Sequence, residues 1–585
     1  MKALESRHAF GTHLQRGVSA LDSMFPFRFD AFLEANSDAY EWLVGDIKAR
    51  AHSMTKEGLL CRIQDAARFA TASHSGRFAD GTIENLALEI GAELDSAAMG
   101  DRNFSPRLSS IKGVRRVLHV TDQVLGIGGH TRMLMHWIRD DRTSSHTVLL
   151  LDQKAHLPAW FYGTVSAVGG SIIALPSRAP IWKKALWLRC AARHNADLVV
   201  LHHFGPNVAP TVAFARRDGP PVAVLNHADH LFWLGSSVAD LVINLRSVAV
   251  NHTRQRRFVP RNAVLPVPLT DDAPGMLKTD ARFALGIPND HLVLLSVGRA
   301  EKYRPCGGYD FLGTAGKILD HDPRARIYVV GEKAERIAPY VRGPIHQNLN
   351  FVGELEDPTM YRNAADIYLE SFPFGSQTAL LEAALAGLPV VPAYAPLNPL
   401  LVANDDALVS ALPNPLDERE YIERAVLLMR KPDLRPLAGE ELRKQLLVDH
   451  VGEGWLNRLS EIYRQTDILE HLPKPIPVSS CCTSDEDVGL SLWQAMSRPI
   501  PLIGTTLDTD RATGRYVMFA RLNVGDYRAA RRIVLGHLRR TPFHRSSWHL
   551  LAATLKAHAG AGFRRLKAWL RSAADSTIKP MPRWW

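Results

Sequence analysis

Short runs of valine, leucine and isoleucine recur between helical stretches from Val114 onward, and they constrain the fold more than any other feature of the chain. Six of them are VRRVLHV, HTVLLLD, GGSIIALP, ADLVVLHH, PPVAVLNHA and ADLVINLR. After a connector at about 267–276, the alternation restarts with HLVLLSVG, ARIYVVG, NLNFVG, ADIYLESF and LPVVPAY. Such runs, without polar alternation, are typical of parallel strands buried on both faces. We therefore predict an α/β fold of two doubly wound, Rossmann-like domains that face a ligand-binding cleft.

The remaining segments are arranged around these two domains. We predict an N-terminal helical accessory region at 1–110, a first domain at 111–270, a second domain at 277–470, a linker at 471–490 and a basic helical tail at 491–585. The helix GEGWLNRLSEIYRQTDIL, at 452–469, is predicted to close the second domain. The N-terminal region carries no catalytic motif, so its expected roles are acceptor contact, oligomerisation or structural support.

The segment ADIYLESFPFGSQTALLEAALAGLPVVPA, at 365–393, predicts an anion-binding site. A strand leads into a polar turn, and a helix follows directly. The first N–H groups of a helix have no internal acceptor, and the helix dipole adds positive potential there. Ser376, Gln377 and Thr378 add side-chain donors, and Gly375 is counted with them as a candidate binding residue. An ordinary capped turn is the alternative, because serine and threonine cap many helices.

The same segment resembles the donor-site motif of GT-B glycosyltransferases of the group 1 family. Glu382 and the residues Ala383, Ala384, Gly387, Pro389 and Val390 match the second half of that motif. Phe374 stands where the family usually has a first acidic residue. The turn FPFGSQT is more similar to that of O-GlcNAc transferases and bacterial N-glycosyltransferases, in which it binds a nucleotide diphosphate without metal. The resemblance implies that Glu382 holds ribose or sugar hydroxyls.

The first βα loop, LHVTDQVLGIGGHTRML, is a second candidate site. Gly128 and Gly129 allow a ligand to approach the backbone closely, and His130 follows them. Group 1 enzymes carry a similar glycine pair near the donor phosphates, and the O-GlcNAc transferase relatives place a functional histidine in a comparable loop. His130 is therefore a candidate general base, with helix capping as the alternative. The spacing is not a dinucleotide fingerprint.

Two further strand ends carry polar residues. Asn226-His227-Ala228-Asp229-His230 ends the run PPVAVLNHA, where ligands of α/β proteins bind. We count His227 and Asp229 with His130 among the catalytic candidates. We expect them to orient donor or acceptor rather than bind a metal, because their spacing is a poor zinc signature. After HLVLLSVG come Arg299 and Lys302, which match in type the arginine and lysine that hold the donor diphosphate in group 1 enzymes. Glu354 follows NLNFVG, where relatives often contact the nucleoside.

The charge of the chain is concentrated at its C-terminal end. The whole sequence of 585 residues has a net charge of +10, yet residues 511–585 alone carry +14 and the preceding chain carries −4. This distribution argues against a general nucleic-acid-binding enzyme and for a tail with its own partner. Gly525, Asp526, Tyr527, Ala530 and Pro542 match the phase of a tetratricopeptide repeat, with Trp548 at the start of a next repeat.

The tail also contains the segment FRRLKAWLRS. Phe563, Leu566, Trp569 and Leu570 fall on one helical face and basic residues on the other. Such a helix suits an anionic membrane surface or an acidic partner, although the apolar stripe could equally pack on the enzyme body.

The location of the protein is predicted from what the sequence lacks. No run approaches the ~20 uncharged apolar residues that span a bilayer. The segment MKALESRHAFGTHLQRG has no apolar signal core, and the five cysteines show no zinc spacing. We expect a cytoplasmic protein, with peripheral contact at the inner face of the membrane through the tail.

Together these features predict a glycosyltransferase that uses a nucleotide-diphosphate sugar without a metal cofactor. The acceptor, whether glycan, lipid-linked or protein, and the sugar stay open. Phe374 and the turn FPFGSQT favour inversion, with His130 as base. Two alternatives are a catalytically inactive GT-B binding or scaffold protein and a nucleotide-sugar epimerase of the same fold.

Overall fold

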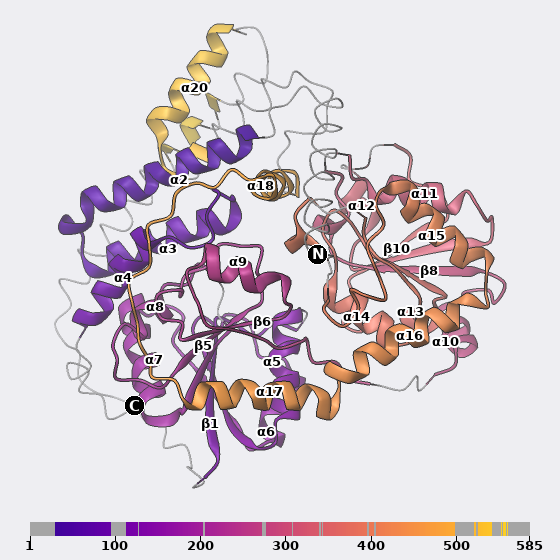
Figure 1. Cartoon of the computed structure of the whole chain (residues 1–585). Coiled ribbons are helices and arrows are strands. Elements are labelled where there is room, and N and C mark those ends of the chain that lie inside the picture. The colour runs from indigo at the N-terminus through magenta and orange to yellow at the C-terminus, as the bar shows by residue number, and fades with distance from the viewer. Residues whose placement is uncertain are drawn as a thin grey trace, which may run out of the picture.

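Two parallel sheets, one in each lobe of the molecule, form the body of the computed structural model (Figure 1). It describes residues 30–94, 113–497, 520–540 and 551–559, with gaps at 127, 203–204, 272–275, 307, 339–340, 342, 395–396, 403–404, 522–523, 553 and 557. The first sheet has seven strands in the order β3-β2-β1-β4-β5-β6-β7, and the second has five in the order β10-β9-β8-β11-β12. The predicted α/β fold of two doubly wound domains is confirmed.

The strands lie where the apolar runs predict them. In the first sheet they are β1 (Arg115–Thr121), β2 (Ser144–Leu150), β3 (Ser171–Ala174), β4 (Leu198–Leu201), β5 (Val222–Asn226), β6 (Leu241–Asn244) and β7 (Asn262–Val264). In the second they are β8 (Leu292–Val297), β9 (Ala325–Val330), β10 (Leu349–Gly353), β11 (Ile367–Leu369) and β12 (Val390–Val391). Only β7, a three-residue edge strand, corresponds to no predicted run.

Helices cover both faces of each sheet, as the burial of the strands requires. Those of the first domain are α5 (Gly129–Asp140), α6 (Ala159–Ala167), α7 (Ile181–Asn195), α8 (Ala209–Ala213) and α9 (Val248–Arg256). Those of the second are α10 (Lys278–Leu285), η4 (Ala300–Lys302), α11 (Phe311–Leu319), α12 (Ala334–Ile337), α13 (Thr359–Ala364), α14 (Gln377–Leu385), η6 (Pro399–Leu401), α15 (Glu418–Arg430) and α16 (Leu434–Asp449).

The helix α17 (Gly452–Asp467) is found at the predicted place in the chain but on the other domain. Trp455, Leu459, Ile462 and Tyr463 pack with residues of β1, β4, β5 and α5 in a single core cluster. Figure 1 shows α17 lying along the first domain. The prediction that this helix closes the second domain is therefore wrong. The apolar stripe in its sequence indicates that one face of the helix is buried, but it does not indicate which sheet covers that face.

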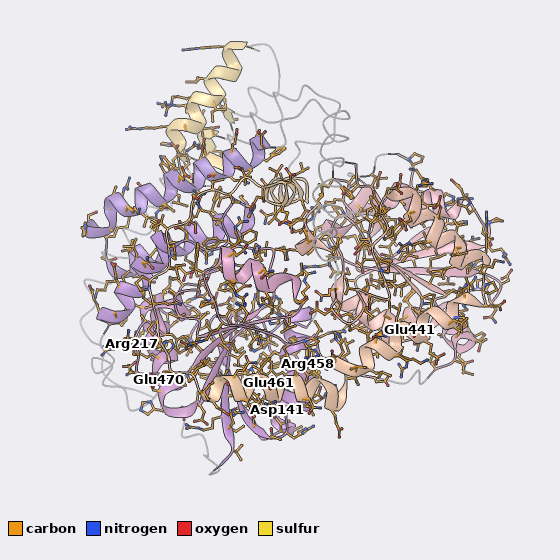
Figure 2. All side chains as sticks on the ribbon, in the orientation of Figure 1. Asp141, Arg217, Glu441, Arg458, Glu461 and Glu470 are labelled. Atoms are coloured by element: carbon orange, nitrogen blue, oxygen red, sulfur yellow. The ribbon has the colours of Figure 1, made fainter. Side chains whose placement is uncertain are left out.

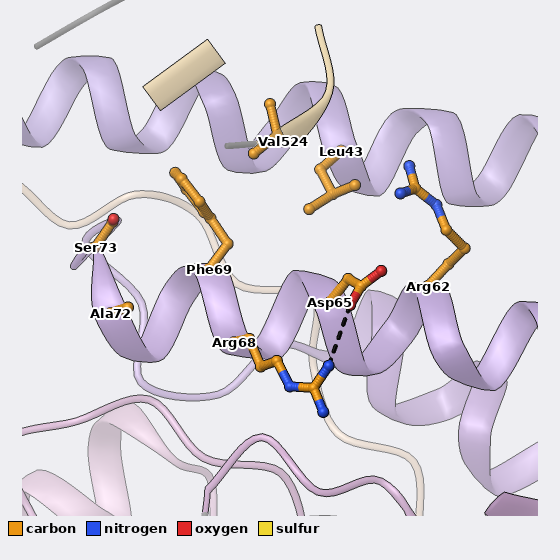
Figure 3. A pocket seen from close by; sticks show the side chains of 8 residues that line it. All are labelled: Leu43, Arg62, Asp65, Arg68, Phe69, Ala72, Ser73 and Val524. Carbon is orange, nitrogen blue, oxygen red and sulfur yellow. Dashed lines mark hydrogen bonds and ion pairs between the residues drawn. The ribbon is translucent and has the colours of Figure 1, made fainter. Parts of the chain in front are cut away.

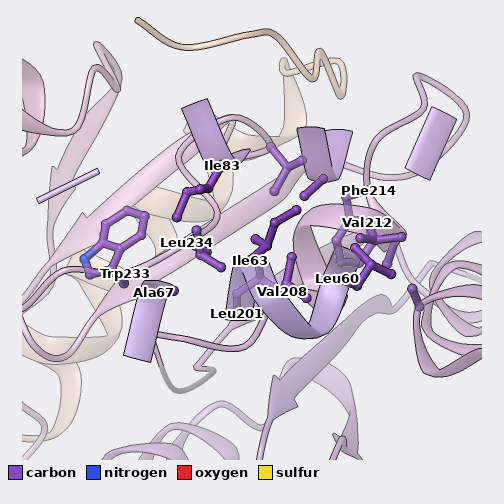
Figure 4. Packing of buried hydrophobic residues seen from close by; sticks show 14 of the residues in the cluster. Leu60, Ile63, Ala67, Ile83, Leu201, Val208, Val212, Phe214, Trp233 and Leu234 are labelled. Atoms are coloured by element: carbon purple, nitrogen blue, oxygen red, sulfur yellow. The ribbon is translucent and has the colours of Figure 1, made fainter. Parts of the chain in front are cut away.

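The N-terminal helices form a layer on the first domain. They are α2 (Asp30–Arg50), η1 (Ala51–Ser53), α3 (Lys56–Ala72) and α4 (Gly81–Glu93), and residues 1–29 and 95–112 lie outside the described chain. In Figure 4, Leu60, Ile63 and Ile83 meet residues of the first domain, among them Val212 and Phe214. The predicted accessory region is helical where it is described, and it shares its core with the first domain.

The segment predicted as a linker, 471–490, packs along this helical layer. The N–H of Lys474 donates to the carbonyl of Ser237 at 2.9 Å, and that of Gly81 donates to the carbonyl of Pro477 at 3.0 Å. Its last residues already belong to α18 (Asp485–Ser497), whose Leu490 and Trp493 are buried. The helical tail thus begins with a helix that is part of the body.

The rest of the tail is described only in part. The helix α20 (Tyr527–Arg540) follows Gly525-Asp526, and the carboxylate of Asp526 accepts from the N–H of Ala529 at 3.1 Å. Ala530 and Val534 are buried on its inner side. Pro542, Trp548 and the segment FRRLKAWLRS lie outside the described residues, so the repeat stays a prediction. None of the described helices has the length and apolarity needed to cross a membrane.

The N-terminal layer packs backbone to backbone at Gly91 of α4. A Cβ added to Gly91 would lie 2.4 Å from the carbonyl oxygen of Val212, whereas one added to Gly45 of α2 would meet open space. We expect Gly91→Ala to destabilise the protein by about 1–3 kcal/mol through overpacking. Gly45→Ala should stabilise it by at most about 1 kcal/mol, the helix-propensity gain.

Urea unfolding of the two alanine variants beside the wild type measures the difference. Equal midpoints for Gly91→Ala and the wild type would contradict the close packing of α4 on α8.

Candidate functional site

The predicted site residues gather where the strand order of each sheet reverses. These points lie between β1 and β4 in the first sheet and between β8 and β11 in the second, and ligands of doubly wound folds bind at such points. The two edges face one another: a Cβ on Gly129 would lie 3.5 Å from the hydroxyl oxygen of Thr378. Gly128 has φ 141°, in the region that favours glycine. The glycine loop and the FPFGSQT turn are therefore opposite walls of one cleft.

The N-terminus of α14 does not have an ordinary side-chain cap. Ser376 occupies the N-cap position, yet its side chain makes no capping hydrogen bond. The side-chain amide nitrogen of Gln377, Nε2, is buried without a hydrogen-bond partner. The first N–H groups of a helix have no intrahelical acceptor, so this end of α14 is suited to an anion. The capped-turn alternative is thus not what the structure shows.

Lys302 lies beside this turn, half-buried in η4. Its ammonium donates to the carbonyl of Gly375 at 2.5 Å and lies 4.5 Å from the centre of the Phe374 ring. Gly298 makes the approach possible, since a Cβ there would lie 3.0 Å from both Lys302 and Ser376. Burial lowers the pKa of Lys302 and the carboxylate of Glu370 raises it. Lys302 and the turn thus lie together, and the diphosphate-binding role predicted for them stays a prediction.

Arg299, by contrast, extends into the open cleft. Its side chain is 73% exposed and pairs with Glu301 at 3.2 Å. It is close enough to His130 to lower the pKa of that imidazole, after burial as the first cause. A cation on an exposed side chain is free to move toward an incoming anion, so Arg299 can complete a positive wall with Lys302.

Glu370 is a buried site residue that the sequence analysis did not single out. Its carboxylate accepts the N–H of Ser376, and burial raises its pKa. One of its oxygens is buried without a hydrogen-bond partner. Its place directly after β11, behind Lys302, is the signal that marks it. Its charge offsets part of the charge of Lys302 from inside the domain.

Phe374, which replaces the usual acidic residue, is packed among rings. It lies 4.7 Å from Trp493 of α18 and 5.1 Å from His230, measured between ring centres. A carboxylate in this place would lose these contacts and face Trp493 instead. The departure from the family motif is therefore matched by α18, which covers the turn from the side.

Two predicted nucleotide contacts have protein partners. Glu382 accepts from Arg362 at 2.6 Å and from Arg132, on α5 of the first domain, at 3.3 Å. Glu354 is exposed and pairs with Arg336 at 3.3 Å. A ligand hydroxyl would share Glu382 with these arginines. The roles predicted for Glu382 and Glu354 stay predictions.

Asp229 holds a guanidinium that joins the two domains. Its carboxylate accepts from Arg246 at 2.8 and 3.1 Å. Arg246 also donates to the carbonyls of Leu400 and Val402 in the second domain, at 2.8 and 2.5 Å. Burial raises the pKa of Asp229, but Arg246 and His230 lower it far more, so the carboxylate is ionised. Asp229 is thus placed to orient the domains, while a direct catalytic role stays a prediction.

His130 and His227 form a stacked pair at the cleft. Their ring centres are 4.0 Å apart with an interplanar angle of 21°. Although the His130 side chain is open to the cleft, the surrounding protein lowers its pKa, as do Arg299 and His230. Burial and the neighbouring His130 and His202 lower the pKa of His227. Both imidazoles are therefore neutral at neutral pH and able to accept a proton.

Three further histidines, which the sequence analysis missed, continue from His227 into the first domain. The nitrogen-to-nitrogen distances are 3.3 Å from His227 to His202, 3.0 Å from His202 to His119, and 3.1 Å from His119 to His146. The available signal is one histidine in or just after each of four predicted strands. In the described chain no group of three or more His, Cys, Asp or Glu side chains is arranged to hold a metal ion.

Two surface hollows lie elsewhere. One, of about 380 Å³, is bounded by α2, α3 and Val524, where Arg68 pairs with Asp65 (Figure 3). The other, of about 520 Å³, lies along α16 and α17 and includes Asn457 and Gln465. Neither is lined by a predicted site residue, so the cleft between the domains is the candidate site.

One family model matches most of the second domain. Residues 291–431 match the model described as glycosyl transferases group 1. This segment, about a quarter of the chain, is similar to group 1 glycosyltransferases. It runs from β8 to α15 and includes Arg299, Lys302, Ser376 and Glu382, the residues that carry the motif resemblance. A search of curated proteins finds no match to the chain.

Solved structures with a similar fold are distant from the chain. A Thermobaculum terrenum O-GlcNAc transferase is 18% identical over 74% of this chain and 82% of its own, with a TM-score of 0.46. Sucrose-phosphate synthase from Thermosynechococcus elongatus is 14% identical over 60% and 99%, with a TM-score of 0.44. Anabaena HepE in complex with UDP and glucose is 14% identical over 61% and 100%, with a TM-score of 0.43. At these sequence identities and TM-scores, the activity of none of the three proteins is transferred to this chain.

The buried histidines predict how stability depends on pH. Burial is the first cause that lowers the pKa of His119, His146 and His227, so the native protein keeps them neutral where the unfolded chain binds protons. Their stabilising share is complete above pH ~6.5 and is lost as pH falls toward the native pKa values, at up to about 1.4 kcal/mol per pH unit for each histidine.

His119→Asn removes one of these groups. Urea unfolding between pH 7.5 and 5.5 should therefore show a weaker loss of stability than in the wild type. The surface variant His156→Asn is the control and should behave as the wild type. An unchanged slope in His119→Asn would show that His119 is protonated in the native state.

Proposed function

We propose that the chain transfers a sugar from a nucleotide-diphosphate sugar to a hydroxyl or amide of an acceptor, without a catalytic metal. The observation that carries the proposal is the uncapped N-terminus of α14, with Lys302 against the turn and Arg299 opposite His130. Helix N–H groups and two cations together can bind a diphosphate. The group 1 match of the same segment supports this use.

In the proposed reaction the bound diphosphate is the leaving group. As the bond between the anomeric carbon and the phosphate oxygen breaks, its electron pair leaves with the diphosphate. The ammonium of Lys302, the guanidinium of Arg299 and the N–H groups of α14 stabilise the negative charge that develops. Because Lys302 is half-buried, its interaction is stronger than that of a fully hydrated cation.

The acceptor would enter from the first domain, where the stacked histidines line the cleft. One of the two neutral imidazoles, His130 or His227, takes the proton of the acceptor as its oxygen or nitrogen attacks the anomeric carbon. Direct displacement by an attacking acceptor inverts the anomeric configuration, which is the outcome predicted from the sequence. Anomeric NMR of the product would reveal retention if a covalent or front-face route operates instead.

A non-catalytic GT-B protein is the second candidate. It is favoured by two observations: Phe374 replaces an acidic residue, and Glu382 is engaged by Arg132 and Arg362. Such a protein would bind nucleotide without turning over sugar. The epimerase alternative has no observation in its favour.

The test is incubation of the purified protein with UDP-, GDP- and ADP-sugars in the presence of EDTA. We expect nucleotide binding in calorimetry and sugar release or transfer with one donor. Binding without turnover would identify the non-catalytic candidate, and no binding at all would refute both.

Lys302→Ala tests the site within the same assay. Loss of a preorganised cation costs about 2–4 kcal/mol of transition-state stabilisation, so kcat should fall by about 30- to 1000-fold. Lys317→Ala, on the exposed face of α11, is the matched control and should retain wild-type turnover. Turnover of Lys302→Ala within a few-fold of the wild type would show that Lys302 does not stabilise the leaving diphosphate.

We also propose that the basic tail brings the enzyme to an anionic membrane surface or an acidic partner. The support is its net charge of +14 over 511–585. Because α18 packs on Phe374, a truncated chain should end after Ser497 rather than near residue 490. The full chain should co-sediment with anionic vesicles more than the truncated one and lose this at high salt. Equal sedimentation would exclude the membrane, leaving an acidic protein to be sought by pull-down.

A further inference from the structure

Four histidines cross the first sheet in a diagonal line. His146 of β2 pairs in register with Val117, two residues before His119, and His119 of β1 pairs with Val200, two residues before His202. In the next step Leu201 pairs with Val224, which puts His202 opposite Leu225, two residues before His227. Each step moves one strand sideways and two residues toward the cleft. Because side chains two residues apart share a face, all four lie on one side of the sheet.

That side is the one covered by α5 and α17. Val117, Val200 and Leu225, the strand residues two before the histidines, pack there with Trp137 and Trp455. The ring of Trp137 lies 5.4 Å from that of His119 and 5.9 Å from that of His202. The titratable groups at the two ends of the line are His130 at the cleft end and Asp141 at the far end.

The far end of the line is anchored by Asp141. Its backbone carbonyl lies 2.9 Å from Nε2 of His146, and its carboxylate lies 3.6 Å from the same nitrogen. Tyr463 of α17 donates to that carboxylate at 2.7 Å. Burial raises the pKa of Asp141, but hydrogen bonds from Tyr463, Thr143 and Ser144 together lower it by more. The net pKa is below its ordinary value, so the carboxylate is ionised. Figure 2 shows Asp141 beside α17.

This anchor determines which nitrogen of each neutral ring carries the proton. A carbonyl only accepts, so Nε2 of His146 must be the N–H, and Nδ1 must be the acceptor. His119 then donates from Nε2 to His146 and accepts at Nδ1 from Nε2 of His202. His202 in turn accepts at Nδ1 from Nε2 of His227. The series ends at Nδ1 of His227, an unprotonated nitrogen with no hydrogen-bond partner in the described part of the chain.

We propose that these four histidines are a proton relay that makes Nδ1 of His227 the general base of the reaction and carries the resulting positive charge to Asp141. The proposal rests on the proposed glycosyl transfer. His227 is then the catalytic residue, His202, His119 and His146 are positioning residues, and His130 stacks on the base. The structure thus assigns the base to His227, where the sequence favoured His130.

The proton transfers balance along the line. The acceptor gives its proton to Nδ1 of His227 as it forms its bond to the anomeric carbon and the diphosphate leaves with the electron pair. His227 passes its Nε2 proton to Nδ1 of His202, His202 passes its Nε2 proton to His119, and His119 does the same to His146. His146 keeps both N–H groups and becomes an imidazolium beside the carboxylate of Asp141. After product release the protons return by the same route, and Nδ1 of His227 loses its proton to water.

The destination of the charge gives the relay its purpose. An imidazolium at His227 would be stacked on His130, which disfavours a cation there. An imidazolium at His146 has a carboxylate at 3.6 Å. Moving the charge away from the cleft therefore makes His227 a stronger base while the acceptor is bound.

The first test does not depend on activity. Long-range ¹⁵N–¹H spectra of histidine-labelled protein report which ring nitrogen is protonated, and single His→Asn variants assign the signals. We expect the Nε2–H form for all four histidines at neutral pH. An Nδ1–H form at His227 would overturn the proposal whether or not the protein transfers sugar.

The second test measures turnover once a donor is known. His119→Asn keeps a polar side chain but cannot pass a proton between two nitrogens, so kcat should fall by about 10- to 100-fold with donor KM within twofold. The wild type should show a curved proton inventory in H₂O/D₂O mixtures, and His119→Asn a linear one. His471→Asn is the control: His471 is equally buried between Asp240 and the carbonyl of Phe214, at 2.7 Å from each, but lies off the relay.

The outcomes are separable. If His119→Asn does not fold, His146→Asn at the far end replaces it. A linear inventory in the wild type, or equal effects of His119→Asn and His471→Asn, would overturn the relay while leaving the glycosyltransferase intact. If no donor is turned over, the proposed function fails, and the ¹⁵N spectra still decide whether the four tautomers are aligned.

Discussion

A single buried guanidinium determines how the two domains face one another. Arg246 is held by the carboxylate of Asp229 and reaches the carbonyls of Leu400 and Val402 in the other domain. A buried arginine is tolerated only where its charge is paired and its N–H groups have acceptors. The Asp229 carboxylate and the two carbonyls must therefore keep their positions around the guanidinium. Arg246 thus joins the domains beside the cleft, and Arg132 joins them again through Glu382.

Within that cleft, burial sorts the charged groups by what they can do. Glu370 is buried and Lys302 is half-buried, and both bond to the turn before α14, whereas Arg299 is exposed in the cleft. On the opposite wall, burial lowers the pKa of His130 and His227, so both imidazoles are neutral. The site therefore has cations on one wall of the cleft and neutral imidazoles on the other, an arrangement that the proposed sugar transfer would use.

Much of this could be predicted from the sequence, because strands buried on both faces leave continuous apolar runs and the turn at 371–378 carries its own motif. The failures share a cause. The helix α17 shows an apolar stripe, but nothing local says that Trp455 belongs to the other domain's core. Arg132 and Glu382 pair across 250 residues of chain. Likewise, a single histidine in a strand is an ordinary core residue until the register aligns it with three others.

The passage of α17 to the first domain means that the chain crosses between the domains twice, and the two crossings are bonded to each other. The N–H of Leu269, in the first crossing, donates to the carbonyl of His450 in the second at 2.8 Å. The imidazole of His450 lies 2.8 Å from the carbonyl of Val267 and 3.1 Å from Asp405. Gly452, at φ 54°, follows at the start of α17. The two connecting segments are hydrogen-bonded to each other, so one cannot slide past the other without breaking these bonds. Connecting segments of this kind are where domain movements take place in other two-domain proteins. Any change in the orientation of the two domains would have to pass through these two segments, which His450 joins.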